Sequence, residues 1–449
     1  MLAVASLAAL ALLADPLELS AGVTAEVRVG QTPIVPGEDP KFAQGALLTP
    51  AVALDARSRE LTLHLDYGLR LYGQHPHADG DKDILMLNVA NLRLIALPSR
   101  ISSVTASASA QLGATDYAFL TQTVLNQATM APQTQSRTPE FLSLTGTVTG
   151  LLRASGRLTL QLKTDGTYRE PRNVPPATTT SDMMSTPLIS VFSFPRQSAL
   201  LVTPGITYAL TRQDDLTFST AFGYQSTSSD VTTKPMMGDP TTTTLNLSVF
   251  YVAPRVTWRR RLTPETDLGL SGGVAWSDYL AGSVRPTNAS PWTGLGSAEL
   301  SSRLLQRHDV GLTARGSLMV DYFVDPILGI AGPRGSAGGG LAAVLPPDWA
   351  LGLDLFFGTN LTAPQLPPQS MQGASIPNVS TLDVTVASVT AWSRRRLSDN
   401  ALAELGIRWS DRAPYLGGVS APTFGFHQRQ LWVYVGFTAT TRPQPRWSP

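Results

Sequence analysis

A compact run of histidine and aspartate residues is the first part of the sequence where chemistry could be expected. It holds His75, His77, Asp79, Asp81 and Asp83, and imidazole and carboxylate groups this close together could bind a metal ion. The aspartate spacing resembles the start of a calcium loop, but the later ligands and the bidentate glutamate are missing. We therefore expect a solvated external loop, with no metal and no cofactor.

Two other segments could suggest catalysis or phosphate binding. His64 and Asp66 would share one face of a strand and could resemble half of a hydrolase dyad, but no serine stands in a nucleophile-elbow motif. The run Gly335–Gly340 lacks the Lys-Ser/Thr pair that follows in a phosphate-binding loop, so we expect a flexible loop that enters a strand. These patterns argue against an enzyme, and we assign no catalytic residue.

Composition narrows the class of protein further. The chain of 449 residues has no cysteine and a formal net charge of +1, which excludes disulfides, zinc–cysteine sites and a basic field for nucleic acid. Charged residues make up 15%, well below the roughly 25% of an average soluble protein. Past the extreme N-terminus, however, no segment approaches the ~18 consecutive apolar residues of a membrane helix. A helical membrane protein is therefore excluded.

The N-terminal segment has the character of an export signal. Residues 2–13 are apolar except for Ser6, and small residues at Ala14 and Ala21 offer two cleavage points, of which the second is favoured. The basic region that normally precedes such a segment is missing, since the first basic residue is Arg28. The alternative is an apolar strand or helix of the mature fold. We predict a signal peptide over residues 1–21.

Most of the remaining chain alternates between apolar and polar residues with a period of two. One segment alternates Leu61, Leu63, Leu65, Tyr67, Leu69 and Leu71 with Thr62, His64, Asp66, Gly68 and Arg70. Such strands have one apolar face, and many are longer than the usual 5 or 6 residues, near the ~9 to 11 of a tilted membrane strand. A soluble sandwich or propeller also alternates, but its polar face would carry many charges, whereas this one is mostly Thr, Ser, Gly, Gln and Asn.

The connections between the strands also alternate in length. Short turns are predicted at 56–59, 97–100, 154–157, 212–215, 262–265, 306–309, 345–348 and 397–400, and long loops at 114–140, 170–197, 226–243, 362–379 and 412–428. We predict an all-β fold, a transmembrane antiparallel β-barrel in the bacterial outer membrane with short periplasmic turns and long extracellular loops. The barrel should span residues 22–441, with a short periplasmic tail at 442–449.

The count of strands is about 18, with 16 as the alternative. The uncertainty comes from residues 84–97, where the apolar phase slips between Val89 and Leu92, which indicates a bulge or two short strands. A barrel of this size is wide enough for an aqueous channel. Its predicted pore lining, of mixed sign, comprises Glu26, Arg28, His64, Asp66, Arg70, Lys163, Asp165, Asp267, Arg315, Asp321, Asp354, Glu404 and Arg408. Mixed signs favour a neutral hydrophilic solute such as a sugar chain over a charge-selective pore.

Two tryptophans precede basic clusters at predicted turns. Trp258 leads into Arg259–Glu265 and Trp392 into Ser393–Asn400, which suits rings at the membrane interface with guanidinium groups facing water and lipid head groups. This succession of hairpins resembles the outer-membrane β-barrel proteins associated with exopolysaccharide export systems. The resemblance is a diffuse pattern over most of the chain, so no functional residue is carried over.

The resemblance implies a passage for a polymer that a periplasmic export protein delivers. The expected partners are therefore outer-membrane lipid, the barrel-assembly machinery and a periplasmic polysaccharide export protein, with no nucleic acid. Two alternatives stay open: a general diffusion porin for small hydrophilic solutes, and a structural or adhesive surface barrel whose loops carry the function. No long globular region precedes the first predicted strand, so we expect neither a plug nor periplasmic repeat domains.

Overall fold

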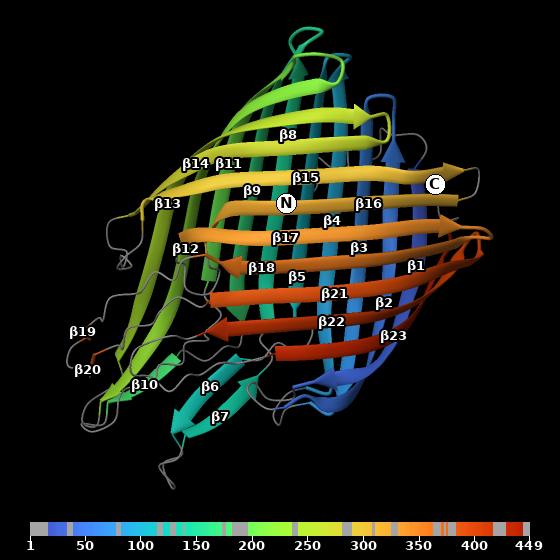
Figure 1. Cartoon of the computed structure of the whole chain (residues 1–449). Coiled ribbons are helices and arrows are strands. Elements are labelled where there is room, and N and C mark those ends of the chain that lie inside the picture. The colour runs from blue at the N-terminus through green and yellow to red at the C-terminus, as the bar shows by residue number, and fades with distance from the viewer. Residues whose placement is uncertain are drawn as a thin grey trace.

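The computed structural model describes residues 17–33, 39–77, 82–114, 120–125, 132–137, 140–172, 177–181, 196–235, 241–280, 290–307, 310–324, 331–361, 370–371, 374–375, 383–415 and 428–442. Among these residues no helix has the length and hydropathy needed to span a membrane. The described elements are strands, and one long sheet dominates (Figure 1).

Eighteen of the described strands form a closed wall. They are β1 (Leu17–Thr32), β2 (Lys41–Arg57), β3 (Leu61–His75), β4 (Ile84–Ser99), β5 (Ser102–Gly113), β8 (Glu140–Arg153), β9 (Leu158–Arg172), β11 (Arg196–Ala209), β12 (Asp214–Pro235), β13 (Thr241–Thr263), β14 (Thr266–Tyr279), β15 (Trp292–Arg307), β16 (Val310–Val324), β17 (Ala331–Leu345), β18 (Trp349–Asn360), β21 (Asp383–Ser398), β22 (Ala401–Tyr415) and β23 (Gln428–Thr440).

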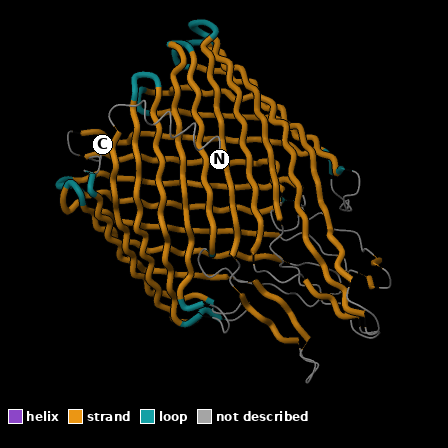
Figure 2. The backbone as a smooth tube through the Cα atoms, turned by 180° about the vertical axis from the view of Figure 1, so that it is seen from behind, coloured by secondary structure: helices purple, strands orange, loops and turns teal. Residues whose placement is uncertain are grey.

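Each wall strand pairs antiparallel with the next, and β23 returns to pair with β1 from Gly22↔Thr440 to Gln31↔Leu431. This last pairing closes the sheet into a barrel, which Figure 2 shows as a continuous mesh of strands. Closure leaves no strand edge in the wall, as a sheet in lipid requires. The predicted count of 18 strands is confirmed.

The five other strands lie outside this ring. The short β10 (Ala177–Ser181) adds to the sheet by pairing in parallel with the end of β12. A separate hairpin of β6 (Leu120–Leu125) and β7 (Pro132–Arg137) lies beyond the end of the wall in both views, and β19 (Ser370–Met371) pairs with β20 (Ala374–Ser375) (Figures 1 and 2).

The wall has one apolar and one polar face, and the apolar face is the outer one. Val27 is 62% exposed, whereas the next residue along β1, Arg28, is 6% exposed. The same alternation leaves large apolar side chains uncovered on many strands, among them Leu65, Val148, Phe218, Leu318, Leu355, Leu405 and Val435. An exposed apolar belt of this extent would be unstable in water but is the surface that contacts lipid. This agrees with the predicted barrel, in which the apolar face of each strand faces lipid and the polar face lines the interior.

Seven of the eight predicted short turns are confirmed, and residues 308–309 of the turn predicted at 306–309 lie outside the described residues. Successive strands there are separated by two to four residues, as between β13 and β14 at 264–265 and between β21 and β22 at 399–400. These turns form one end of the barrel, here called the turn rim, and the long connections form the opposite end, the loop rim. The start of β1 and the end of β23 also lie at the turn rim, where Ala21 pairs with Val52 and Thr440 with Gly22.

Strand boundaries differ from the predictions at three places. β1 begins at Leu17 rather than residue 22, so Leu17–Ala21 belong to the wall, while residues 1–16 lie outside the described residues. The predicted loop at 226–243 is largely strand, because β12 runs to Pro235 and β13 starts at Thr241. This part is rich in threonine, a β-branched residue that favours strands. Gly335–Gly340 is not a loop but the middle of β17.

The phase slip in residues 84–97 has neither of the predicted causes. β4 is one strand, and its register with β3 runs from Ala96 to Ile84 without a shift. The apolar residues instead change face, because Leu85, Leu87 and Val89 point inward. There they join buried clusters with Tyr72 of β3 and Phe141 of β8. The shift in the apolar pattern therefore marks a place near the loop rim where the inner face of the barrel is apolar.

Candidate functional site on the inner wall

All thirteen predicted lining residues lie in the inward-facing phase of their strands. Arg255 of β13 contacts Asp321 of β16 at 2.8 Å between Nη2 and Oδ1, although two strands separate them. Such a contact can form only on the concave side of the sheet, which identifies the inner face. The strand registers place the other twelve predicted residues on the same face: Glu26 and Arg28 of β1, His64, Asp66 and Arg70 of β3, Lys163 and Asp165 of β9, Asp267, Arg315, Asp354, Glu404 and Arg408. Their role as a pore lining stays a prediction.

Several charged groups of this face form ion pairs between strands. Arg315 of β16 donates to Asp354 of β18 at 2.6 Å, and Arg394 of β21 donates through Nε to Glu404 of β22 at 2.6 Å. The second carboxylate oxygen of Glu404 accepts a hydrogen bond of 2.7 Å from the Tyr434 hydroxyl. Because each positive group lies beside a negative one, these pairs balance the charge of the inner surface and do not form a ring of like charges such as a charge-selective pore would use.

Trp392 corrects one prediction, because it lies inside the barrel and not at the membrane interface. Its indole Nε1 donates to Asp354 at 3.4 Å, and the guanidinium carbon of Arg394 lies 4.4 Å from its ring centroid. The strand explains the error. Trp392 is two residues from Arg394 on β21, so both side chains point to the same face, and Arg394 faces the interior. The outer position near this turn belongs to Trp349, 5.3 Å from the Arg395 guanidinium.

Trp258 has the placement that a ring at the interface would have. It lies on the outer face near the turn rim, paired in register with Leu216 and Leu270. Leu270 is itself 41% exposed, so Trp258 belongs to the apolar belt. Its role at the membrane interface stays a prediction.

Glycines opposite the large inner side chains let those side chains lie flat against the wall. A Cβ on Gly352 would come within 2.2 Å of Cε2 of Trp392, and one on Gly406 within 2.5 Å of the Tyr434 ring. A Cβ on Gly340 would meet Nε of Arg315 at 2.8 Å. Aromatic rings often cover cross-strand glycines in sheets. Here the arrangement keeps bulky side chains close to the backbone and leaves space in the lumen.

Cavities follow the inner wall. One, about 860 Å³, is lined by Arg259, Asp267, Glu299, Arg315 and Asp354, among others. A second of about 700 Å³ shares Asp267, Arg315 and Asp354 with it and adds Trp392. The two are therefore adjacent, near the turn rim. A third, about 300 Å³, is lined by His64, Asp66 and the hydroxyl groups of neighbouring strands.

The inner face is more closely filled toward the loop rim. There the Arg28 guanidinium lies 4.2 Å from the Tyr72 ring centroid and 4.7 Å from that of Trp432. All three residues are buried, and the buried residues Leu85 and Leu87 lie on the neighbouring strand. Sequence reasoning missed this cluster, although the phase slip in 84–97 was its signal.

His64 lies between two carboxylates. Its Nδ1 lies 2.8 Å from Asp55 and its Nε2 lies 3.4 Å from Asp66, which accepts a further bond from Asn91. The predicted proximity of His64 and Asp66 is confirmed. Both ring nitrogens are thus engaged with carboxylates, which gives no arrangement for activating a serine.

The histidine–aspartate run at the loop rim includes a contact between His77 and Asp83. His77 Nε2 lies 2.9 Å from Asp83 Oδ1, while Asp79 and Asp81 lie outside the described residues. Within the described part of the chain, no three His, Asp or Glu side chains come together as metal ligands would.

A closed antiparallel wall, an outer apolar belt and a polar lumen together define the class of protein. The chain is a bacterial outer-membrane β-barrel. Its outer face contacts membrane lipid, and its inner face encloses the polar groups described above.

Comparisons with known proteins find similarity among solved structures. No family model and no curated protein matches the sequence. Among solved structures, the copper transporter OprC is similar at 15% identity and a TM-score of 0.47, covering 94% of this chain and 80% of its own. The ferric-catecholate import receptor Fiu from E. coli K12 is similar at 11% identity and a TM-score of 0.48, with coverages of 94% and 81%. Likenesses of this extent imply no shared cargo.

Proposed function

We propose that this barrel is the outer-membrane passage for an exported polysaccharide and works with a periplasmic export partner. The observation that carries the proposal is the inner wall, which holds paired charges of both signs and the hydroxyl groups of serine and threonine side chains. A surface of this kind can exchange hydrogen bonds with a hydroxyl-rich chain without holding it by net charge. An export signal ahead of β1 and insertion by the barrel-assembly machinery belong to the same proposal.

The arrangement of the two rims supports a passage that depends on a partner. The turn rim, which faces the periplasm in outer-membrane barrels, carries the two larger cavities, while Arg28, Tyr72 and Trp432 form a buried cluster on the loop-rim side. A polymer delivered from the periplasm would therefore enter at the end that carries these cavities. We expect the barrel to be largely closed until the partner docks.

A general diffusion porin is the second candidate, supported by the same polar lumen. The two differ in what the barrel does alone. We expect the purified barrel in a planar bilayer to show little steady conductance, and deletion of its gene to remove surface polysaccharide while polymer accumulates in the periplasm. A steady open conductance, together with normal surface polysaccharide in the deletion strain, would overturn the export function and favour the porin.

A further inference from the structure

Three exposed arginines stand at the turn rim, on the outer face or at the tip of a turn, and are called here the arginine collar. Arg100 lies in the turn between β4 and β5, Arg307 ends β15, and Arg395 lies near the end of β21. Arg307 pairs in register with Val310 and Arg395 with Trp349, and both partners have the outward phase of their strands. The collar therefore stands where the outer, lipid-facing surface ends.

Each arginine of the collar has exposed apolar side chains beside it in the chain. Leu97 and Ile101 flank Arg100, Leu304 and Leu305 precede Arg307, and Leu397 follows Arg395. These five apolar side chains are 41% to 57% exposed. An arginine can lay its apolar stem along such a surface while its guanidinium group reaches a polar partner. Basic and apolar groups together at one level are typical of the boundary between acyl chains and head groups.

The collar arginines have no acidic partner within the described part of the chain. Other arginines at this rim do have one: Arg396 pairs with Asp399, Arg260 with Asp214, and Arg442 with Glu18 and Asp55. Arg395 instead lies against the Trp349 ring, with its guanidinium carbon 5.3 Å from the ring centroid. The three positive charges of the collar are therefore available to an anion from outside the chain.

We propose that the arginine collar binds the phosphate groups of anionic phospholipids, so that the barrel associates with phosphatidylglycerol more strongly than with zwitterionic lipids. A guanidinium group can bind two phosphate oxygens at once. A zwitterionic head group carries an ammonium beside its phosphate, which offsets the attraction, whereas an anionic head group keeps its full charge. The collar lies outside the lumen, so this binding does not depend on what the barrel transports.

The apolar neighbours favour a lipid over an acidic protein surface as the occupant. The outer face next to the collar is the apolar belt that contacts lipid, and Leu304, Leu305 and Leu397 continue this belt to the rim. A phospholipid covers both parts at once, with its acyl chains on the leucines and its phosphate on the arginines. An acidic protein surface would match the arginines but would place polar groups against these leucines.

Electron paramagnetic resonance with spin-labelled lipids tests the selectivity of the full-length barrel. The barrel is placed in phosphatidylcholine vesicles, and the probes are phosphatidylglycerol and phosphatidylethanolamine with a nitroxide on one acyl chain. We expect phosphatidylglycerol to associate about threefold more strongly at low salt, averaged over the lipids around the barrel. The difference should shrink at about 1 M salt, where exposed charges are screened beyond about 3 Å.

Two double variants remove the same number of charges from the same two parts of the chain. Arg100→Gln with Arg307→Gln should remove most of the preference for phosphatidylglycerol. Arg93→Gln with Arg303→Gln should leave the preference unchanged, because these arginines have the inward phase of β4 and β15. Heat-modifiable migration on gels confirms folding of each variant.

Three results would overturn lipid binding by the collar. They are equal association of the two probes with the parent barrel, an equal loss of preference in both double variants, and a preference that persists without Arg100 and Arg307. The last result would leave these arginines to an acidic protein surface. Conductance and surface polysaccharide report separately on the passage.

Discussion

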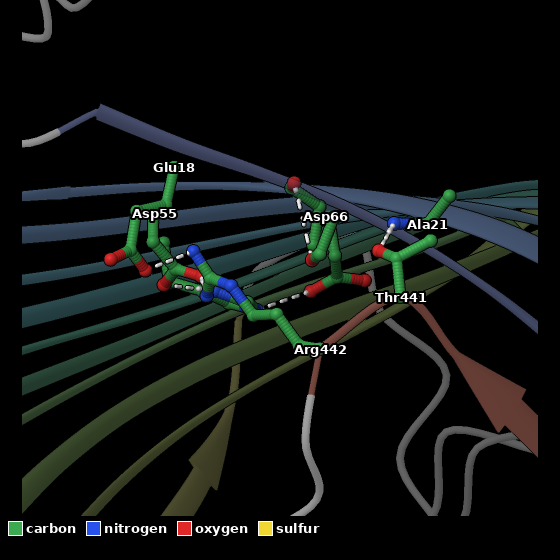
Figure 3. Close-up of polar contacts among 9 residues, drawn as sticks. Glu18, Ala21, Asp55, Asp66, Thr441 and Arg442 are labelled. Atoms are coloured by element: carbon green, nitrogen blue, oxygen red, sulfur yellow. Dashed lines mark hydrogen bonds and ion pairs between the residues drawn. The ribbon is translucent and has the colours of Figure 1, made fainter. Parts of the chain in front are cut away.

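Arg442, the second residue after the last wall strand, contacts Asp55 of β2 across a sequence separation of 387 residues (Figure 3). Its guanidinium also contacts Glu18 of β1, and Thr441 Oγ1 accepts a hydrogen bond of 2.9 Å from the Ala21 amide. These contacts link the chain after β23 to the first two strands at the turn rim. Asp55 in turn contacts His64, which extends the connection to β3.

Replacing Arg442 should weaken the closure of the barrel. Because Asp55 is 9% exposed, Arg442→Ala leaves a nearly buried carboxylate with one partner fewer, and we expect a loss of about 1–2 kcal/mol in the free energy of unfolding. Urea unfolding in lipid vesicles measures it. Lys82→Ala, which removes an exposed ion pair at the loop rim, is the control and should have almost no effect. An equal loss in both variants would contradict the role of Arg442.

A disulfide can test directly whether β1 and β23 are neighbours. The hydroxyl oxygens of Thr24 and Thr438 are 3.1 Å apart on the inner face, and the chain has no natural cysteine. We expect the variant with Thr24→Cys and Thr438→Cys to cross-link on oxidation and to migrate as a closed loop on a denaturing gel. A pair with Thr24→Cys and Thr390→Cys should not cross-link. Cross-linking of the second pair, or of neither, would refute this seam.

Consecutive residues of β21 provide a matched test of the two faces. Val389 faces lipid and Ser388 lines the large cavity. Val389→Lys should therefore cost about 2–4 kcal/mol near the middle of the bilayer, while Ser388→Lys should be tolerated because its ammonium group stays in water. The free energy of unfolding in vesicles distinguishes them. The opposite order would mean that the faces are assigned the wrong way round.

The glycine beneath Trp392 should resist even a small side chain. A methyl group at position 352 would meet the indole at 2.2 Å, so Gly352→Ala must push the ring into the lumen. Overpacking of this kind costs roughly 1–3 kcal/mol. Gly316→Ala on the outer face, where nothing lies within 4 Å of the added carbon, is the control. Thermal unfolding of the two variants should differ, and identical midpoints would show that the ring does not rest on Gly352.

The β6–β7 hairpin should be dispensable for the barrel. Its strands pair with each other in a sheet separate from the wall. Replacing residues 115–139 by a short Gly-Ser linker should leave heat-modifiable migration and the unfolding midpoint unchanged. If surface polysaccharide also persists, the loop is not needed for the passage. Loss of a surface function with an intact barrel would instead favour the structural or adhesive alternative.

Most of the wall could be predicted because lipid outside and water inside impose a strict alternation. The segment 61–71 shows this, since each of its apolar residues faces outward and His64, Asp66 and Arg70 face inward. The pattern fails where the inner face is itself apolar, as at Leu85 and Leu87, because alternation cannot indicate which side an apolar residue packs on.

The candidate site was predicted only in part. The phase of the strands was enough to place Arg315, Asp354 and Glu404 on the inner face. Trp392 was misplaced because a tryptophan near a basic turn suits either face, and only its register with Asp354 and Gly352 decides. The prediction of a loop at Gly335–Gly340 was wrong for a related reason. A glycine within a strand makes room for the side chains of neighbouring strands, and the sequence alone does not show which side chains those are.

The pairing of the first strand with the last has a consequence for biosynthesis. Every other pairing of the wall joins strands that are consecutive in the wall and are translated one after the other, whereas β1 must wait for β23, the last strand of the wall. Until then its amide and carbonyl groups lack their permanent partner on one side. The sheet therefore stays open along this seam until β23 has been made, and the ring can close only after that.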